Sequence, residues 1–163
     1  EGMYHYDGHR EHKIRMTPTE SKKKKNICPV CSRPLTIGVL HRVDDLATQP
    51  EGHVPENAVP FTSLVELDKI IAESLNIKSR ASKKVQQEFW VLVAAAKGEL
   101  RLLLDLPLDD ITRFAPGRIV EAIRRLREHR VAKIEPGYDG EYGHVSLFDD
   151  HEKLPGQKTL FDD

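Results

Sequence analysis

The sequence lacks the features that mark disulfide-stapled and membrane-spanning proteins. Only two cysteines are present, Cys28 and Cys31, so a framework of several structural disulfides is excluded. The longest apolar run extends from Phe89 to Ala96, far short of the roughly 20 residues needed to cross a bilayer. No secretory signal is visible either. These absences predict a cytoplasmic protein without a membrane partner.

An overall excess of charge of one sign is also missing, because the net charge is −1. The charges are nevertheless unevenly distributed along the chain. Four lysines follow one another from Lys22 to Lys25, residues 118–133 carry six basic residues against two acidic ones, and residues 149–163 are acidic on balance. Basic segments of this kind favour an anionic partner through salt-sensitive attraction, and the run from Lys22 to Lys25 predicts a flexible loop.

Composition divides the chain into four zones, which together predict an α+β protein. Residues 1–40 are rich in His, Lys and Cys and form a candidate zinc-knuckle module. Residues 41–62 contain three prolines and indicate a linker. Residues 63–148 predict a mainly helical domain that ends in a short β-hairpin, and residues 149–163 predict a disordered tail.

Apolar spacing and capping residues predict four helices in the third zone. Ser63 and Glu66 form a potential capping box at the start of the first helix, and Ser82 is a candidate N-cap of the second. Trp90 lies on the apolar second helix, which favours a place in the core. The expected helices span residues 63–75, 82–97, 107–114 and 118–129, and two short strands are expected within 131–148.

Two residue pairs with the same spacing indicate one metal site. Cys28-Pro-Val-Cys31 has the form of a zinc knuckle, in which a tight turn directs two thiolates at one ion. A closed structural zinc site needs four ligands, and His9 and His12 supply a second pair. His5 is a competing ligand. Because residues 1–40 hold too few apolar side chains for a core, structural zinc is the expected staple.

Three other interpretations of this segment stay open. The thiols could form a redox pair, although the flanking residues lack the strand-to-helix pattern of thioredoxin-like motifs. The histidines could be a solvated cluster or the relic of an expression tag. The whole segment could also be disordered if no metal binds. Zinc is favoured because a segment with so little apolar surface needs a metal to fold.

Two stretches of the sequence resemble a known family. YHYDGHREH at 4–12, followed by NICPVCSRPLTIGVLHRVDDLA at 26–47, is similar to the zinc-binding segment of the endonuclease Q family, also described as PHP-domain or UvrD-associated proteins. PGYDGEYGHVSLF at 136–148 resembles the block that closes the helical C-terminal region of that family. His9 and His12 stand where family members often have two cysteines, or one His and one Cys.

The resemblance implies a role in DNA repair. Members of the family nick DNA on the 5′ side of deaminated bases and at abasic sites, through an N-terminal PHP domain that holds catalytic metal ions. The resemblance begins at the zinc segment, so we expect this chain to be part of a longer protein whose PHP domain and catalytic divalent metals lie outside it. The chain would then engage damaged duplex DNA and support its own PHP domain, with no catalytic residue of its own and a nucleoid-associated location.

Candidate DNA contacts are basic or aromatic residues near the expected helices and turns. The stretch FAPGRIVEAI resembles a helix-hairpin-helix, in which backbone amides approach a phosphate. A solvated arginine face that pairs with its own glutamates is the alternative. An exposed tyrosine in the Gly-rich turn could stack on an unpaired base or close a hairpin over the core. The nucleic-acid-binding candidates are Arg42, Arg118, Arg124, Arg125 and Tyr138.

The tail contains a further interaction motif. Gln157, Leu160 and Phe161 fit a Q-x-x-L-F pattern that resembles peptides docking on bacterial sliding clamps. A disordered tail suits this mode, because the apolar pair can enter a pocket while the amide forms a hydrogen bond. A sliding clamp is therefore an expected partner.

Two rival functions remain open on the sequence alone. The chain could be a zinc-ribbon module that binds protein and not DNA. It could also be a helicase-associated accessory region, although the sequence contains no Walker-type phosphate loop for ATP.

Overall fold

The computed structural model describes residues 2–149 and residue 152. The chain divides into two compact units, each assembled from two separate stretches. Unit 1 comprises residues 1–61 and 134–144, and unit 2 comprises residues 62–133 and 145–163. The helical stretch 62–133 is therefore inserted between the two parts of unit 1. The return of residues 134–144 to the N-terminal unit was not anticipated from the sequence.

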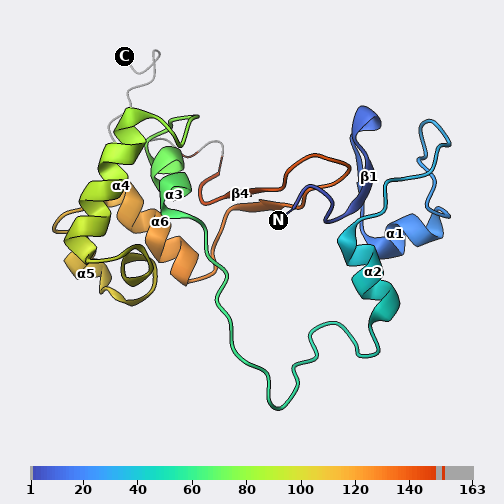
Figure 1. Cartoon of the computed structure of the whole chain (residues 1–163), viewed down its shortest axis with the longest axis horizontal. Coiled ribbons are helices and arrows are strands. Elements are labelled where there is room, and N and C mark those ends of the chain that lie inside the picture. Colours follow the sequence, from blue (N-terminus) through green and yellow to red (C-terminus); the bar gives the residue numbers. More distant parts are fainter. Residues whose placement is uncertain (1, 150–151, 153–163) are drawn as a thin grey trace. The chain divides into compact units, whose positions relative to one another are not determined.

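Unit 1 is built from short elements. They are β1 (Asp7–His9), η1 (Arg10–His12, a single 3₁₀ turn), β2 (Ile14–Met16), α1 (Pro18–Lys23) and α2 (Val39–Leu46) (Figure 1). β1 and β2 pair antiparallel, with Gly8 opposite Arg15. Thr17 starts α1 through a complete capping box with Glu20, which supports a helix of only six residues.

Two parts of unit 1 are more ordered than expected. The run Lys22–Lys25 is not a free loop, because α1 includes its first two residues and Lys22 Nζ lies 2.6 Å from both Asp44 and Asp45. Helix α2 extends into the first part of the expected linker. The exposed coil between the units therefore begins after α2 (Figure 1).

The apolar cluster of unit 1 is small, and a buried carboxylate network connects several elements of the unit. Among the described residues, the buried members of the cluster are Met16, Cys28 and Leu35, and Ile14 and Cys31 pack against them. Asp7 is fully buried; its Oδ2 lies 2.5 Å from His41 Nδ1 and accepts a hydrogen bond from Ser21 Oγ. Asp7 Oδ1 accepts the N–H of Gly38 at 2.7 Å. This network links β1 to α1 and α2, in a place where few apolar contacts exist.

Unit 2 contains most of the helices. They are α3 (Leu67–Ser74), α4 (Lys83–Ala96), η2 (Arg101–Asp105, a π-helical segment), α5 (Leu108–Ile111) and α6 (Gly117–Arg127) (Figure 1). Ser82 caps α4 as expected, by accepting the N–H of Val85. The expected capping box of the first helix is wrong, since α3 begins after Glu66 and Ser63 lies outside it.

The core of unit 2 lies among α3, α4, η2 and α6. Its largest fully buried side chains include those of Leu67, Ile70, Leu102, Ile119 and Ile123. The helical spacing of apolar residues in 118–129 is confirmed, because Ile119, Ala122, Ile123 and Leu126 of α6 are all buried. Trp90 is not in this core, contrary to expectation, because 65% of its surface is exposed.

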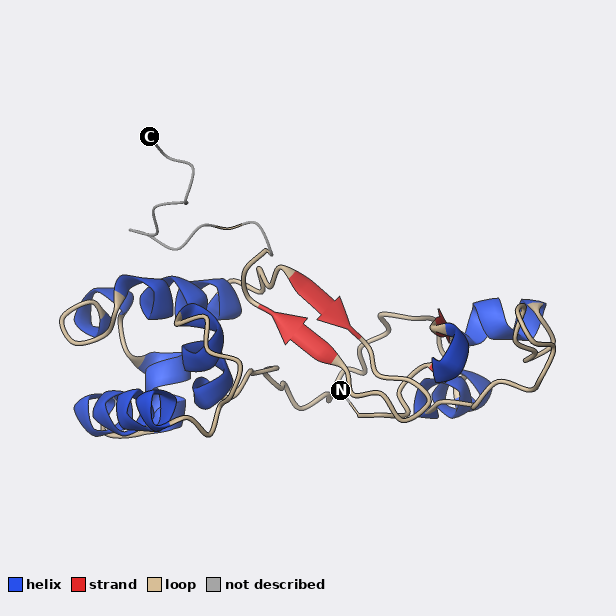
Figure 2. Ribbon diagram, turned by 90° about the horizontal axis from the view of Figure 1, so that it is seen from above, coloured by secondary structure: helices blue, strands red, loops and turns tan. Residues whose placement is uncertain are grey.

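Two short strands complete the described chain. β3 (Lys133–Glu135) and β4 (His144–Ser146) form a two-stranded sheet and run in opposite directions (Figure 2). The boundary between the units falls within both strands. The expectation of a mixed fold with helices and a short terminal hairpin is therefore confirmed. Within the described part of the chain, no helix combines the length and apolarity needed to span a bilayer.

Candidate metal centre

Three of the four predicted metal ligands lie together in unit 1. One donor atom from each of His9, His12 and Cys31 lies within 4.8 Å of the others. The strand β1 and the following turn η1 place the two histidines, whose ring centroids are 4.8 Å apart. The consecutive elements β1 and η1 thus bring His9 and His12 together. Cys31, which lies later in the chain, completes the group.

The turn that carries the cysteines is held by backbone hydrogen bonds. The N–H of Cys28 donates to the carbonyl of Arg33 at 2.8 Å, and the N–H of Ser32 donates to the carbonyl of Cys28 at 2.9 Å. Burial raises the pKa of the Cys28 thiol, but hydrogen bonds from the N–H groups of Cys31 and Val30 outweigh it, so this pKa lies below its ordinary value. The turn therefore favours the thiolate, which is the form that binds a metal.

The donor set fits a zinc ion. His9 Nδ1 is buried and makes no hydrogen bond within the described part of the chain, so a strong acceptor atom lacks the partner that burial normally demands. Imidazole nitrogens and thiolates are the donors that structural zinc prefers. Cys28 lies outside the three-residue group but interacts with the Cys31 thiol, which leaves it as the fourth candidate.

The competing histidines have other neighbours. The His5 ring stacks on that of Tyr6, with centroids 5.4 Å apart. His41 is engaged with Asp7 through a 2.5 Å contact. Neither histidine belongs to the group formed by His9, His12 and Cys31.

Residues 134–144 pack directly on the strand that carries His9. The carbonyl of Gly137 accepts the N–H groups of His5 (3.1 Å) and Tyr6 (2.9 Å), and the N–H of Gly140 donates to the carbonyl of Met3 at 3.1 Å. The Tyr138 ring lies over Gly8, where an added Cβ would meet its Cδ2 at 2.3 Å. The predicted base-stacking residue is thus used, at least in part, to cover β1.

A carboxylate from the same segment reaches the loop between the two histidines. Asp139 Oδ2 accepts the N–H of Arg10 at 2.7 Å, and Asp139 Oδ1 accepts a hydrogen bond from Thr36 Oγ at 2.5 Å. Asp139 was missed from the sequence, where its turn was considered only for its tyrosines and glycines. No local signal predicts this contact, because it joins positions 129 residues apart.

Arg118 and Arg125 of α6, both predicted to contact DNA, are engaged within unit 2. The Arg118 guanidinium stacks on Phe148, with Cζ 3.8 Å from the ring centroid. Arg125 binds Glu152 at 2.6 Å and donates to the carbonyl of Leu147 at 3.0 Å. These contacts fix the end of the chain's described part on α6.

Arg124 is paired in the same way, whereas Arg42 is not buried. Arg124 binds Glu121 of α6 at 2.7 Å and Glu128, the C-cap of α6, at 3.2 Å. Arg42 is exposed on α2. The geometry thus favours the alternative of an arginine face paired with its own glutamates, and DNA contact by these residues stays a prediction. Gln157, Leu160 and Phe161 lie outside the described residues.

Comparison with known proteins relates the chain to archaeal relatives. The family described as MJ0043 C-terminal domain matches residues 66–130. The uncharacterized protein MJ0043 of Methanocaldococcus jannaschii is 30% identical over 147 residues, which cover 90% of this chain and 18% of that relative.

Two crystal structures share the fold over nearly the whole chain. The lesion-specific endonuclease PfuEndoQ from Pyrococcus furiosus is 27% identical, with a TM-score of 0.76 over 90% of this chain and 35% of that one. An Endonuclease Q complex with a 27-mer duplex carrying an abasic lesion at the active site is 26% identical, with a TM-score of 0.73 over 91% and 36% of the two chains.

The chain therefore shares its fold with part of the lesion-specific endonuclease PfuEndoQ and with part of the Endonuclease Q complex. The chain is similar to part of these endonuclease Q structures, so the resemblance expected from the sequence is confirmed. It spans about a third of the length of the matched endonuclease structures.

Proposed function

We propose that this chain is the DNA-engaging and scaffolding part of an endonuclease-Q-like repair nuclease that nicks 5′ of deaminated bases or at abasic sites. The observation that carries the proposal is the match, over 91% of this chain, to an endonuclease Q structure bound to duplex DNA. The catalytic PHP domain and its divalent metals are supplied from outside these residues. The chain itself contributes affinity for damaged duplex DNA and a folded support for that domain.

Unit 1 performs this role as a zinc-stapled module. His9, His12, Cys28 and Cys31 hold the ion, and the buried, unpartnered His9 Nδ1 supports this assignment. Zinc supplies no catalytic chemistry here; it joins the β1–η1 loop to the cysteine turn. Because the apolar cluster of unit 1 contains only three buried residues, metal binding contributes much of its folding free energy.

The metal is tested by elemental analysis of the untagged chain. One zinc per chain is expected, and the paired substitution His9→Ala/His12→Ala removes it. His53→Ala is the matched control, because His53 is exposed in the coil that follows α2. Equal zinc in the wild-type chain and the double variant would refute the assignment of the histidines.

DNA engagement is tested with fluorescence anisotropy on the zinc-loaded chain. A labelled duplex with one abasic site should bind, and affinity should fall as salt rises, because phosphate contacts release counterions. The same chain should not nick the duplex. Weak binding that is independent of salt would instead support a protein-binding zinc ribbon, and the proposed DNA role would then fail.

A sliding clamp is the second proposed partner, through Gln157, Leu160 and Phe161. The sequence pattern alone supports this part of the proposal. In this proposal, the tail recruits the protein to replicated DNA, and the two folded units contact the lesion.

A further inference from the structure

One side of α4 combines an exposed aromatic ring with basic residues. Trp90 is 65% exposed and Val91 is 55% exposed. The exposed positions recur every three or four residues, so they lie along one side of the helix. We call this set the α4 face; it consists of Lys83, Lys84, Gln87, Trp90, Val91, Ala94 and Ala95.

The indole is held at the surface by its neighbour in the sequence. Phe89 packs against the core of unit 2, and its ring meets that of Trp90 edge-on, with centroids 5.3 Å apart and planes at 90°. Edge-to-face contact of this kind is a favourable aromatic geometry. Trp90 is therefore supported from one side while most of its surface stays open to a ligand.

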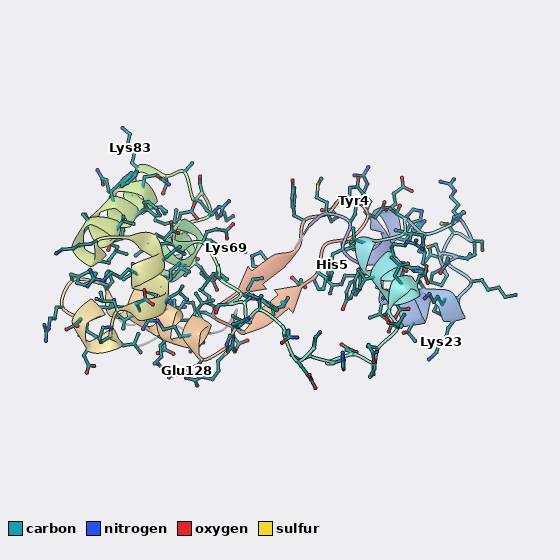
Figure 3. All side chains as sticks on the ribbon, turned by 60° about the horizontal axis from the view of Figure 1, so that its bottom comes forward. Tyr4, His5, Lys23, Lys69, Lys83 and Glu128 are labelled. Atoms are coloured by element: carbon teal, nitrogen blue, oxygen red, sulfur yellow. The ribbon has the colours of Figure 1, made fainter. Side chains whose placement is uncertain are left out.

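The α4 face carries two lysines, Lys83 and Lys84, at the start of the helix. Glu88 is the one acidic residue of α4; it is half-buried and stands one helical turn after Lys84. Within the described part of the chain, Lys83 and Lys84 form no ion pair, and Lys83 extends away from the ribbon at the start of the helix (Figure 3). Glu99, just beyond the helix, is engaged with the N–H of Leu67 at 3.1 Å. These two lysines favour an anionic partner.

We propose that the α4 face binds a DNA strand with unpaired bases, a proposal that rests on the DNA-engaging function inferred above. A base stacks on Trp90, and Lys83 and Lys84 approach the phosphates of the same strand. Ala94 and Ala95 have small side chains that do not project beside the indole, so a nucleotide base can lie flat on the indole ring. An aromatic platform with flanking lysines is a sequence-tolerant way to hold single strands, whereas a peptide helix requires a groove of large apolar side chains.

The sole tryptophan makes the proposal directly measurable. Trp90 is the one tryptophan of the chain, so selectively excited indole fluorescence reports on this face alone. A single-stranded oligodeoxynucleotide added to the zinc-loaded chain should quench it in a saturable manner, and the matching duplex should quench it less. If the strand binds, as shown by anisotropy of a label on the DNA, and the indole signal stays unchanged, the α4 face is not the site.

Substitutions separate stacking from general attraction. Trp90→Leu should weaken single-strand binding at least about five-fold, which corresponds to the lower end of a base–aromatic stack, and Trp90→Phe should recover part of the affinity. Phe61→Leu is the matched control, because Phe61 is an aromatic residue that is 89% exposed outside α4. Equal weakening by Phe61→Leu would overturn the assignment. The logarithm of the binding constant falls linearly with the logarithm of the salt concentration. Lys83→Gln/Lys84→Gln should make this slope shallower by about 0.7 for each phosphate that the lysines no longer neutralise.

The failure of this proposal differs from the failure of the proposed function. Normal DNA binding by Trp90→Leu refutes the α4 face and leaves DNA engagement intact. Absence of any DNA binding by the wild-type chain refutes both. Polyglutamate serves as the second probe: if it displaces the DNA and quenches the indole equally well, the face recognises an acidic protein and the DNA assignment is overturned.

Discussion

The carboxylate of Asp139 and the backbone N–H of Arg10 form a 2.7 Å hydrogen bond across 129 positions of the chain. Arg10 lies between the candidate ligands His9 and His12. Burial raises the pKa of Asp139, but the hydrogen bonds from Thr36 and Arg10 outweigh it, so the pKa lies below its ordinary value. Asp139 therefore holds the histidine loop as a carboxylate, and it would act as a positioning residue for the proposed metal centre.

The first prediction concerns this carboxylate. Asp139→Ala should lower metal affinity about ten-fold, because groups that orient a ligand loop tune the metal site without touching the ion. Cobalt(II) titration followed by visible absorption checks this, since the spectrum reports on the ligands directly. Asp109→Ala, in unit 2, is the control and should leave the affinity unchanged. An Asp139→Ala chain with wild-type affinity would remove the positioning role.

Gly8 is expected to resist substitution. An added Cβ would meet the Tyr138 ring at 2.3 Å and the Ile14 carbonyl at 2.6 Å, and the carbonyl belongs to the paired strand β2. Gly8→Ala should destabilise unit 1 by about 1–3 kcal/mol through overpacking. Gly117→Ala is the control, because nothing lies within 4 Å of its added Cβ. Denaturant unfolding of the zinc-loaded variants measures the difference, and equal stability of both would contradict this close packing around Gly8.

The acid stability of unit 2 should depend on Glu121. Arg125 and Arg124 hold the pKa of Glu121 below its ordinary value of 4.5. A carboxyl group with a lowered folded-state pKa stabilises the fold above its unfolded-state value, and that stability is lost as pH falls through the folded-state value. Helical circular dichroism should therefore show stability declining as pH falls below about 4.5. Glu121→Gln should flatten this decline, whereas Glu51→Gln, in the exposed coil, should not.

The tail motif gives a prediction that is independent of both folded units. Leu160→Ala/Phe161→Ala should abolish binding to a bacterial sliding clamp in calorimetry, because these side chains would fill its apolar pocket. Zinc content and DNA affinity should remain those of the wild-type chain. Lys158→Ala, between the motif residues, is the matched substitution and should retain clamp binding.

Local patterns were sufficient to predict much of unit 2. Ser82 caps its helix as expected, and the apolar spacing of α6 marks its buried stripe, because both signals act within a few residues. Trp90 shows where such reasoning fails. The apolar composition of its helix assigned Trp90 to the core, yet a helix that packs on one side leaves its other positions exposed to solvent.

Unit 1 was less accessible to sequence reasoning. The paired spacings of His9, His12 and Cys31 pointed to residues that the structure brings together. Asp7 and Asp139 carry no comparable signal, since each acts through partners remote in the sequence. The contacts of Asp139 with Arg10 and of Asp7 with His41 are visible only in the tertiary structure.

The insertion of residues 62–133 between the two parts of unit 1 has a consequence for a cleaved chain. A single cut in the exposed coil after α2 would yield two polypeptides, and each would carry part of unit 1. The hydrogen bonds from His5 and Tyr6 to Gly137, and from Gly140 to Met3, would still join them. The two pieces would thus behave as a split protein that reassembles by fragment complementation, with the helical unit retained on the C-terminal fragment.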